Sequence, residues 1–202
     1  MPRSVLYMSM SLDGFITGPD DGPENGLGTG GEALHAWLFD GDNEVCGGVG
    51  LPIFHTSAAS LPVVQEILAT GAVLTGRRTF DAAGGWGGDH HDGIHIEVLT
   101  RTEPGADAVQ GPNVLYATDG IEAAMARAKA AAGDRNVLVH GAATAQLALQ
   151  TGVLDELEIH QVPVLLGAGR SLFGTPGSPR QLDLVRIIDA PGVTHLRYRV
   201  VS

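Results

Sequence analysis

The chain has 202 residues, of which 44% are hydrophobic, so it is long enough for one sizeable core and too apolar for a disordered protein. Its formal net charge of −11 at pH 7 excludes a phosphate-backbone partner, because nucleic acid and anionic lipid would be repelled. The single cysteine, Cys46, excludes an internal disulfide and a multi-cysteine metal site.

The N-terminal residues 1–14 lack the long apolar stretch and the cleavage site of a secretory signal. No apolar run approaches the length needed to span a bilayer. We therefore expect a cytoplasmic protein without a membrane partner. We find no internal repeat and no linker-like stretch, so we expect a single domain over residues 1–202.

Strand-like and helix-like segments alternate along the chain, which is typical of an α/β sheet. In chain order, the expected strands are 5–10, 72–75, 94–100, 114–117, 137–140, 156–162, 182–188 and 193–201. The expected helices are 32–39, 61–69, 77–83, one that Asp119 caps and that ends near Gly133, and 143–150. Glycine-rich stretches at 18–31 and 41–50 are expected to be loops. The pattern predicts a mixed, mostly parallel sheet that ends in an antiparallel hairpin.

Three expected strands end in residues suited to a phosphorylated ligand, and ligands of open α/β sheets bind beyond the carboxyl ends of strands. After the strand 72–75, Gly76 allows a close backbone approach and Thr79 supplies a hydroxyl. Arg77 and Arg78 are adjacent, so at least one of them should face a ligand. Positive charge at a helix start opposes the helix dipole, which favours ligand binding over a solvated surface pair.

The other two strand ends are less specific. Thr100 and Arg101 suit a phosphate monoester, such as the 2′-phosphate that distinguishes NADP from NAD, although both residue types are also ordinary at exposed strand ends. The third strand runs through His140 into Gly141 and then into a helix start made of the small residues Ala142, Ala143, Thr144 and Ala145. Backbone amides in such a segment can hold a diphosphate. Tight strand–helix packing without a ligand is the alternative interpretation.

These segments follow Ser11-Leu-Asp-Gly-Phe-Ile16, and together they resemble the dihydrofolate reductase superfamily. The closest likeness is to the branch that contains the reductase domain of the bifunctional riboflavin-biosynthesis deaminase-reductase. The matching pieces span nearly the whole chain and are 11–16, 75–80, 139–144, 154–157 and 163–167. The resemblance implies a three-layer α/β fold with a mostly parallel central sheet, a C-terminal antiparallel hairpin and helices on both faces. It also implies an NADPH-dependent reductase that acts on a small molecule.

The resemblance further implies where NADPH would bind. It places Ile16 and Thr17 beside the nicotinamide. Residues 76–79 would meet the diphosphate and the adenosine 2′-phosphate, and residues 100–101 would flank the adenosine. The backbone amides of residues 141–145 would also meet the diphosphate.

The reaction needs a hydride from the nicotinamide and one proton, for which we consider Asp13, Glu32 and His140. Asp13 follows the first strand, near the implied nicotinamide, although Asp-Gly is also ordinary turn chemistry. His140 could face the substrate or could be hydrogen-bonded locally. Dihydrofolate reductase proper carries an acidic residue on its first helix, for which Glu32 or His35 would have to substitute here. This departure favours a different pterin- or pyrimidine-like substrate over folate.

Two other functions stay open. One is a non-catalytic nucleotide-binding module on the same scaffold. The other is the reductase of riboflavin biosynthesis, which acts on 5-amino-6-ribosylaminouracil phosphate, and for which Arg170 would bind the substrate phosphate. Residues 89–95 contain several potential metal ligands, but the turn lacks rigid spacing and we expect no metal. The apolar run 163–166 and the terminal strands favour a homodimer.

Overall fold

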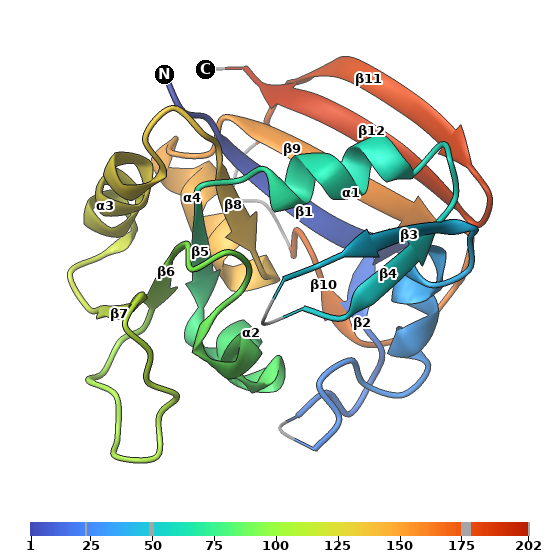
Figure 1. Cartoon of the computed structure of the whole chain (residues 1–202). Helices are drawn as coiled ribbons and strands as arrows, with labels where there is room; N and C mark the ends of the chain where they lie inside the picture. The colour runs from blue at the N-terminus through green and yellow to red at the C-terminus, as the bar shows by residue number, and fades with distance from the viewer. Residues whose placement is uncertain (23, 49–50, 175–178, 202) are drawn as a thin grey trace.

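The computed structural model describes residues 1–22, 24–48, 51–174 and 179–201. At the centre of this part is an eight-stranded sheet with the order β11-β12-β9-β1-β8-β5-β6-β7 (Figure 1). The strands from β9 to β7 are parallel, and β12 and β11 continue the sheet as an antiparallel pair. The strand bounds are β1 Ser4–Ser11, β5 Ala72–Gly76, β6 His95–Leu99, β7 Val114–Ala117, β8 Val137–His140, β9 Glu156–Val162, β11 Leu182–Ala190 and β12 Val193–Val200.

Helices cover both faces of the sheet (Figure 1). Their bounds are α1 Leu61–Leu68, α2 Arg77–Ala82, α3 Ile121–Ala132 and α4 Ala142–Thr151. The central strand β1 is buried on both sides: Leu6 packs in the core beneath α3 and α4, while Tyr7 packs on the opposite side with Phe80 of α2. The predicted α/β class, the mostly parallel sheet and the C-terminal hairpin are confirmed. None of the described helices is both long and apolar enough to cross a membrane.

Two details of the prediction are wrong. Residues 43–46, expected within a loop, form the strand β3 (Asn43–Cys46), which pairs with β4 (Ile53–Thr56); residues 49–50 lie outside the described residues. Asp119 does not cap α3, whose N-cap is Gly120 without a side-chain hydrogen bond. The Asp119 carboxylate instead accepts hydrogen bonds from Arg127, at 2.6 Å from Nη1 and 2.9 Å from Nη2. The charged partner Arg127, two turns further along the helix, has replaced the capping role.

Short elements close the carboxyl end of the sheet. β2 (Phe15–Thr17) pairs with β10 (Arg170–Ser171), so the beginning of the chain lies beside a segment near its end. The helix expected at 32–39 is the 3₁₀ helix η1 (Gly31–Leu38), and a second 3₁₀ segment, η2 (Gly84–Gly88), follows α2.

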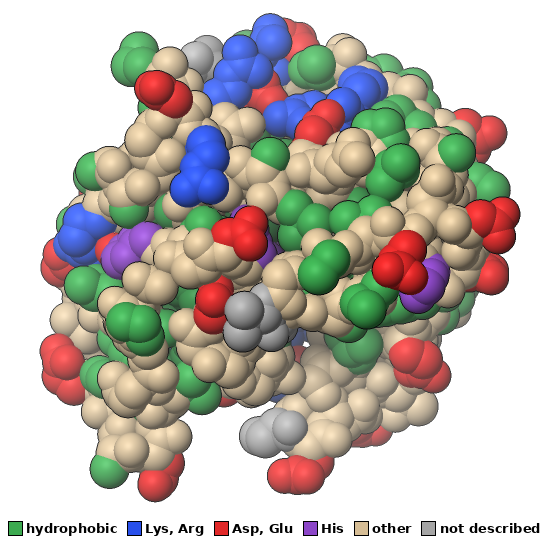
Figure 2. Space-filling model, viewed as in Figure 1, with side chains coloured by type: hydrophobic (Ala, Val, Ile, Leu, Met, Phe, Trp, Pro, Cys, Tyr) green, Lys and Arg blue, Asp and Glu red, His purple; other side chains and the backbone are tan. Residues whose placement is uncertain are grey.

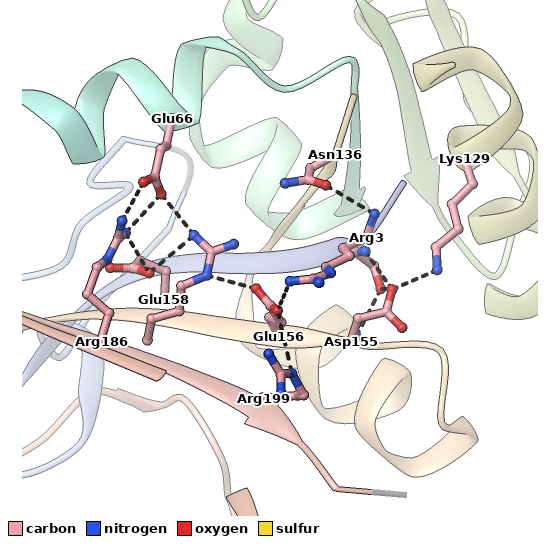
Figure 3. Close-up of polar contacts among 11 residues, drawn as sticks. Arg3, Glu66, Lys129, Asn136, Asp155, Glu156, Glu158, Arg186 and Arg199 are labelled. Carbon is pink, nitrogen blue, oxygen red and sulfur yellow. Dashed lines mark hydrogen bonds and ion pairs between the residues drawn. The ribbon is translucent and has the colours of Figure 1, made fainter. Parts of the chain in front are cut away.

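A network of carboxylates and arginines lies between α1 and the antiparallel end of the sheet (Figure 3). Its buried members are Glu156 and Glu158, two residues apart on β9. Arg197 of β12 bridges Glu156 and Glu66 of α1, at 2.8 Å from each. In the space-filling view, Lys and Arg side chains gather with carboxylates along the top of the molecule (Figure 2). These ion pairs hold α1 and the terminal hairpin to the sheet, and none of these four charged residues lines the cavity described next.

Candidate active site

A cavity of about 380 Å³ opens at the carboxyl edge of the parallel strands. Its wall comes from β1, β2, η1, α2, η2, β8, β10 and the segment 18–31, through Met8, Ile16, Thr17, Asp21, Gly26, Leu27, His35, Arg78, Thr79, Ala82, Ala83, Trp86, His140 and Arg170. In Figure 2 the surface is hollowed at the lower centre, between α2 and the segment 18–31 as Figure 1 locates them. The wall joins apolar side chains to a few convergent polar ones, which is typical of small-molecule sites.

Two glycines let the loops after β5 and β8 interlock beside the cavity. Gly141 has a φ of 88°, and an ideal Cβ there would overlap Thr79 Oγ1. A Cβ on Gly76 would lie 2.9 Å from Thr144 Oγ1. The first and third strand ends singled out in the sequence therefore touch, and the packing role that the sequence left open for the third is present. Thr144 Oγ1 is buried and has no hydrogen-bond partner among the described residues.

The two adjacent arginines of α2 point in different directions. Arg77 forms an ion pair with Asp81, with Nε 2.7 Å from Oδ2, and its guanidinium lies 5.2 Å from the centre of the Tyr116 ring. Arg78 lines the cavity and pairs with Asp21, with Nη2 3.0 Å from Oδ2. Only Arg78 of this pair therefore faces the cavity.

Two histidines contribute to the cavity wall. His140 lies with Nδ1 3.1 Å from the Tyr7 carbonyl oxygen. A carbonyl only accepts, so Nδ1 carries the proton and Nε2 of the neutral ring is an acceptor. Burial lowers the pKa of His140 to about 4, so the ring is neutral at pH 7. On η1, His35 has a buried Nδ1 without a hydrogen-bond partner in the described part of the chain, and burial lowers its pKa as well.

Residues 2–196 match the family model described as the RibD C-terminal domain. The chain belongs to the RibD C-terminal domain family. This result confirms the resemblance to the reductase domain of riboflavin biosynthesis and the dihydrofolate-reductase-like fold class.

Relatives of this RibD C-terminal domain protein agree with the assignment. YwjB of Bacillus subtilis (strain 168), an uncharacterized protein, is 25% identical over 182 residues, which cover 85% of this chain and 82% of YwjB. A crystal structure from Shewanella sp. PV-4, a candidate riboflavin biosynthesis protein, superposes with a TM-score of 0.74 at 20% identity and covers 99% of both chains. Acinetobacter baumannii RibD gives a TM-score of 0.64 at 19% identity and covers 100% of this chain and 59% of its own. A pyrimidine reductase-like protein from Corynebacterium diphtheriae gives 0.64 at 15% identity, over 100% of this chain and 92% of that one.

The cavity of this RibD-like domain unites only some of the residues singled out in the sequence. Seven of them line it: Ile16, Thr17, His35, Arg78, Thr79, His140 and Arg170. The rest of the expected cofactor set lies outside the lining: Gly76, Arg77, Thr100, Arg101, Gly141, Ala142, Ala143, Thr144 and Ala145. Of these, Gly141 packs against Thr79 and Gly76 packs against Thr144, whereas Arg101 is exposed beyond β6.

Two of the three candidate proton donors lie outside the cavity wall. The Asp13 carboxylate accepts hydrogen bonds from Ser11 Oγ at 2.6 Å and from the amide of Gly167 at 2.7 Å. These bonds lower its pKa and tie the first turn to the segment 163–167. Glu32 is exposed on η1. The turn interpretation of Asp13 therefore accounts for its contacts.

Several lining residues were missed by the sequence analysis. Trp86 stands in the turn Gly84–Gly88 with a φ of 48°, and its ring centre is 6.2 Å from that of His140. A tryptophan between two glycine pairs is a usable signal for a ligand-facing turn. Asp21 gave no local signal, because its partners Arg78 and Arg170 are distant in sequence.

The histidine-rich turn at 89–95 is folded inward. His90 and His91 are buried, with their Nδ1 atoms 2.6 Å apart, and the His90 ring packs on Trp86. Among the described residues, no group of three or more His, Cys, Asp and Glu side chains is arranged to hold a metal ion. His90 therefore packs against Trp86, which lines the cavity, and His91 packs against His90.

Proposed function

We propose that this chain is an NADPH-dependent reductase, formed by one domain over residues 1–202, that transfers a hydride to a small pterin- or pyrimidine-like heterocycle. The observation that carries the proposal is the cavity at the carboxyl edge of the sheet, where an apolar floor with Met8 and Ile16 meets the guanidiniums of Arg78 and Arg170. Membership of the RibD C-terminal domain family supports a reductase. The similarity to a pyrimidine reductase-like protein supports a heterocyclic substrate.

The residues around the cavity fit a dinucleotide. α4 begins without a side-chain cap, so its first amides are free, and Thr144 Oγ1 beside them is buried with no partner among the described residues. We assign these groups and Thr79 to the diphosphate, and Arg78 to a phosphate of the cofactor. Ile16 and Thr17 would border the nicotinamide, which supplies the hydride when it is bound.

We also propose that residues 76–77 and 100–101 bind the adenosine end of the cofactor. Arg77 and Arg101 are the cationic side chains there, and both lie outside the cavity lining. A 2′-phosphate at this end would explain a preference for NADPH over NADH.

We assign His140 to substrate binding. Its Nδ1 is committed to the Tyr7 carbonyl, and its neutral Nε2 can accept a hydrogen bond from an N–H group of a heterocycle. A ring with a pKa of about 4 holds no spare proton at pH 7, so His140 would orient the substrate instead of protonating it. Asp13 and Glu32, which do not line the cavity, are not assigned a catalytic role, so the proton that completes the reduction would come from solvent water in the open cavity.

Titration with NADPH and with NADH, followed by tryptophan fluorescence, tests the proposal. Trp86 lines the cavity and Trp37 is buried in a different cluster, so Trp86→Phe should abolish most of the quenching. Arg78→Ala should weaken NADPH binding roughly tenfold or more, because a charge-assisted hydrogen bond contributes about 1.5–3 kcal/mol. Arg135→Ala is the matched control, since Arg135 is exposed beside the amino end of β8, at the opposite edge of the sheet.

Binding of neither nucleotide would overturn the cofactor assignment. NADPH binding without oxidation, when pyrimidine and pterin substrates are added, would favour the non-catalytic module. Oxidation restricted to 5-amino-6-ribosylaminouracil phosphate would favour the riboflavin-pathway reductase. Arg77→Ala and Arg101→Ala should reduce the preference for NADPH over NADH if these residues hold the 2′-phosphate.

We also propose a homodimer. The β11 strand is at the edge of the sheet and exposes Leu182, Leu184, Val185 and Ile187. An unpaired edge with exposed apolar side chains is a surface suited to a second copy of the chain. Sedimentation analysis of the wild type and of Ile187→Lys tests this, and a monomeric wild type would refute it.

A further inference from the structure

One carboxylate joins two arginines at the mouth of the cavity. Asp21 lies on the segment that follows β2, Arg78 is on α2 and Arg170 is on β10. Arg170 places Nη2 3.1 Å from Oδ1 and 3.0 Å from Oδ2 of Asp21. Arg78 places Nη2 3.0 Å and Nε 3.2 Å from Oδ2. Three segments that are distant in sequence therefore converge on a single anion.

The charges of this cluster are not balanced. Two guanidiniums face one carboxylate, which leaves a net charge of +1 in the cavity wall. Burial alone would raise the pKa of Asp21, but the hydrogen bonds from Arg170 and Arg78 outweigh it and the pKa lies below its ordinary value. Asp21 is thus ionised at pH 7, and its side chain is 17% exposed, compared with 60% for Arg78 and 38% for Arg170.

The arrangement has the chemistry of a bound oxyanion. Guanidinium forks on two sides of a pair of oxygens are how proteins hold carboxylate or phosphate groups of ligands. A phosphate has one more free oxygen than a carboxylate and up to twice its charge, so it can use donors that Asp21 leaves partly exposed. Asp21 occupies the place where such a group would bind.

We propose that Arg78 and Arg170 form an anion subsite, that the Asp21 carboxylate fills it in the ligand-free protein, and that a phosphate group of the ligand displaces Asp21. This inference deepens the proposed function, because it assigns a phosphorylated ligand to the cavity. Asp21 is then a specificity-determining residue. Its carboxylate stays paired with the arginines when only weakly bound anions are present, and a ligand with a phosphate group displaces it. The same phosphate chemistry could come from the cofactor or from the substrate.

Calorimetric titration of inorganic phosphate into wild type and Asp21→Asn tests the subsite directly. Removal of the competing charge should tighten phosphate binding about tenfold, a screened value for partly exposed charges. Asp20→Asn is the matched control: it makes the same charge change one residue away, at an exposed position whose φ of 60° asparagine tolerates. We expect less than about a twofold effect from this control. The double variant Asp21→Asn with Arg170→Gln should lose the tighter phosphate binding that Asp21→Asn shows alone.

Binding that is unchanged or weaker in folded Asp21→Asn would overturn the inference. If that variant does not fold, the ¹³C carboxyl resonance of Asp21 in the wild type provides a second readout. It should shift on addition of phosphate, and a resonance that does not move at saturation would also overturn the inference.

Further arms identify the source of the phosphate. If Asp21→Asn binds ribose 5-phosphate more tightly than the wild type does, with no gain in affinity for ribose or for the nucleotides, the phosphate belongs to the substrate. If Asp21→Asn gains affinity equally for pyrophosphate, NADPH and NADH, the subsite holds the cofactor diphosphate. If it gains affinity for NADPH alone, the subsite holds the 2′-phosphate. Tighter phosphate binding in a protein that binds neither nucleotide would support the subsite while refuting the proposed cofactor.

Discussion

Replacement of Arg197 by methionine should remove the cation that joins Glu66 of α1 to Glu156 of the sheet. The Arg197 side chain is 12% exposed, and it neutralises Glu156 and Glu158, which are 2% and 0% exposed. Loss of one partner from a buried ion pair costs about 3–5 kcal/mol, because a charge is left buried and uncompensated. Arg3 and Arg186 remain beside the two glutamates, so we expect the lower end, about 3 kcal/mol.

Urea and thermal unfolding measure this loss. For a domain of this size, 3 kcal/mol corresponds to a fall in Tm of roughly 6–12 °C. Arg199→Met is the matched control on the same strand: Arg199 is 53% exposed and reaches Glu156 only at 4.0 Å, so its loss should stay below about 1 kcal/mol. Equal losses in the two variants, or a loss below about 1 kcal/mol in Arg197→Met, would refute the reasoning about buried charge.

Two further predictions concern the cavity wall and pH. Gly141→Ala should cost about 2 kcal/mol or more in thermal unfolding, because it combines a φ of 88° with overlap on Thr79, and Thr79→Ala in the same chain should restore part of the loss. Gly120→Ala is the matched control, because Gly120 has nearly the same backbone conformation (φ 96°, ψ 166°, against φ 88°, ψ 146° at Gly141) and a Cβ there would meet no nearby atoms; it should cost at least about 1 kcal/mol less than Gly141→Ala, and equal costs would contradict the overlap. Burial lowers the pKa of His140 and of His195 to about 4 from the ordinary 6.5. Between these pH values the unfolded chain binds more protons than the folded chain, so the free energy of unfolding should fall as the pH drops from about 6.5 towards about 4. Urea midpoints at several pH values should show a shallower fall in His140→Gln, and an unchanged slope would exclude His140 as a source.

The fold was accessible from the sequence because its parallel strands are short apolar runs bounded by turn residues. Residues 72–75 and 137–139 are buried on both sides and stand out for that reason. The strand β3 was missed because its side chains alternate between partly buried and exposed beside glycines, and only pairing with β4 makes it a strand. The Asp119 cap failed because propensity at a helix start cannot foresee Arg127, two turns further along.

The candidate site was accessible only in part. Residues at the ends of neighbouring parallel strands must meet at one edge of the sheet, so Arg78, Thr79 and His140 could be anticipated in one place. The direction of each side chain could not be anticipated, and Arg77 turns to Asp81 while its neighbour Arg78 enters the cavity.

The sequence by itself determined the α/β class, the strand ends that carry the candidate ligand-binding residues and the family likeness, because all three depend on local patterns of apolar, glycine and charged residues. The tertiary structure alone decided which charges meet. Asp21 is brought to Arg78 and Arg170 across 57 and 149 residues, and Asp13 is tied to the amide of Gly167 and away from the cavity. Such contacts depend on how the loops pack at the edge of the sheet, and no local preference of the chain specifies them.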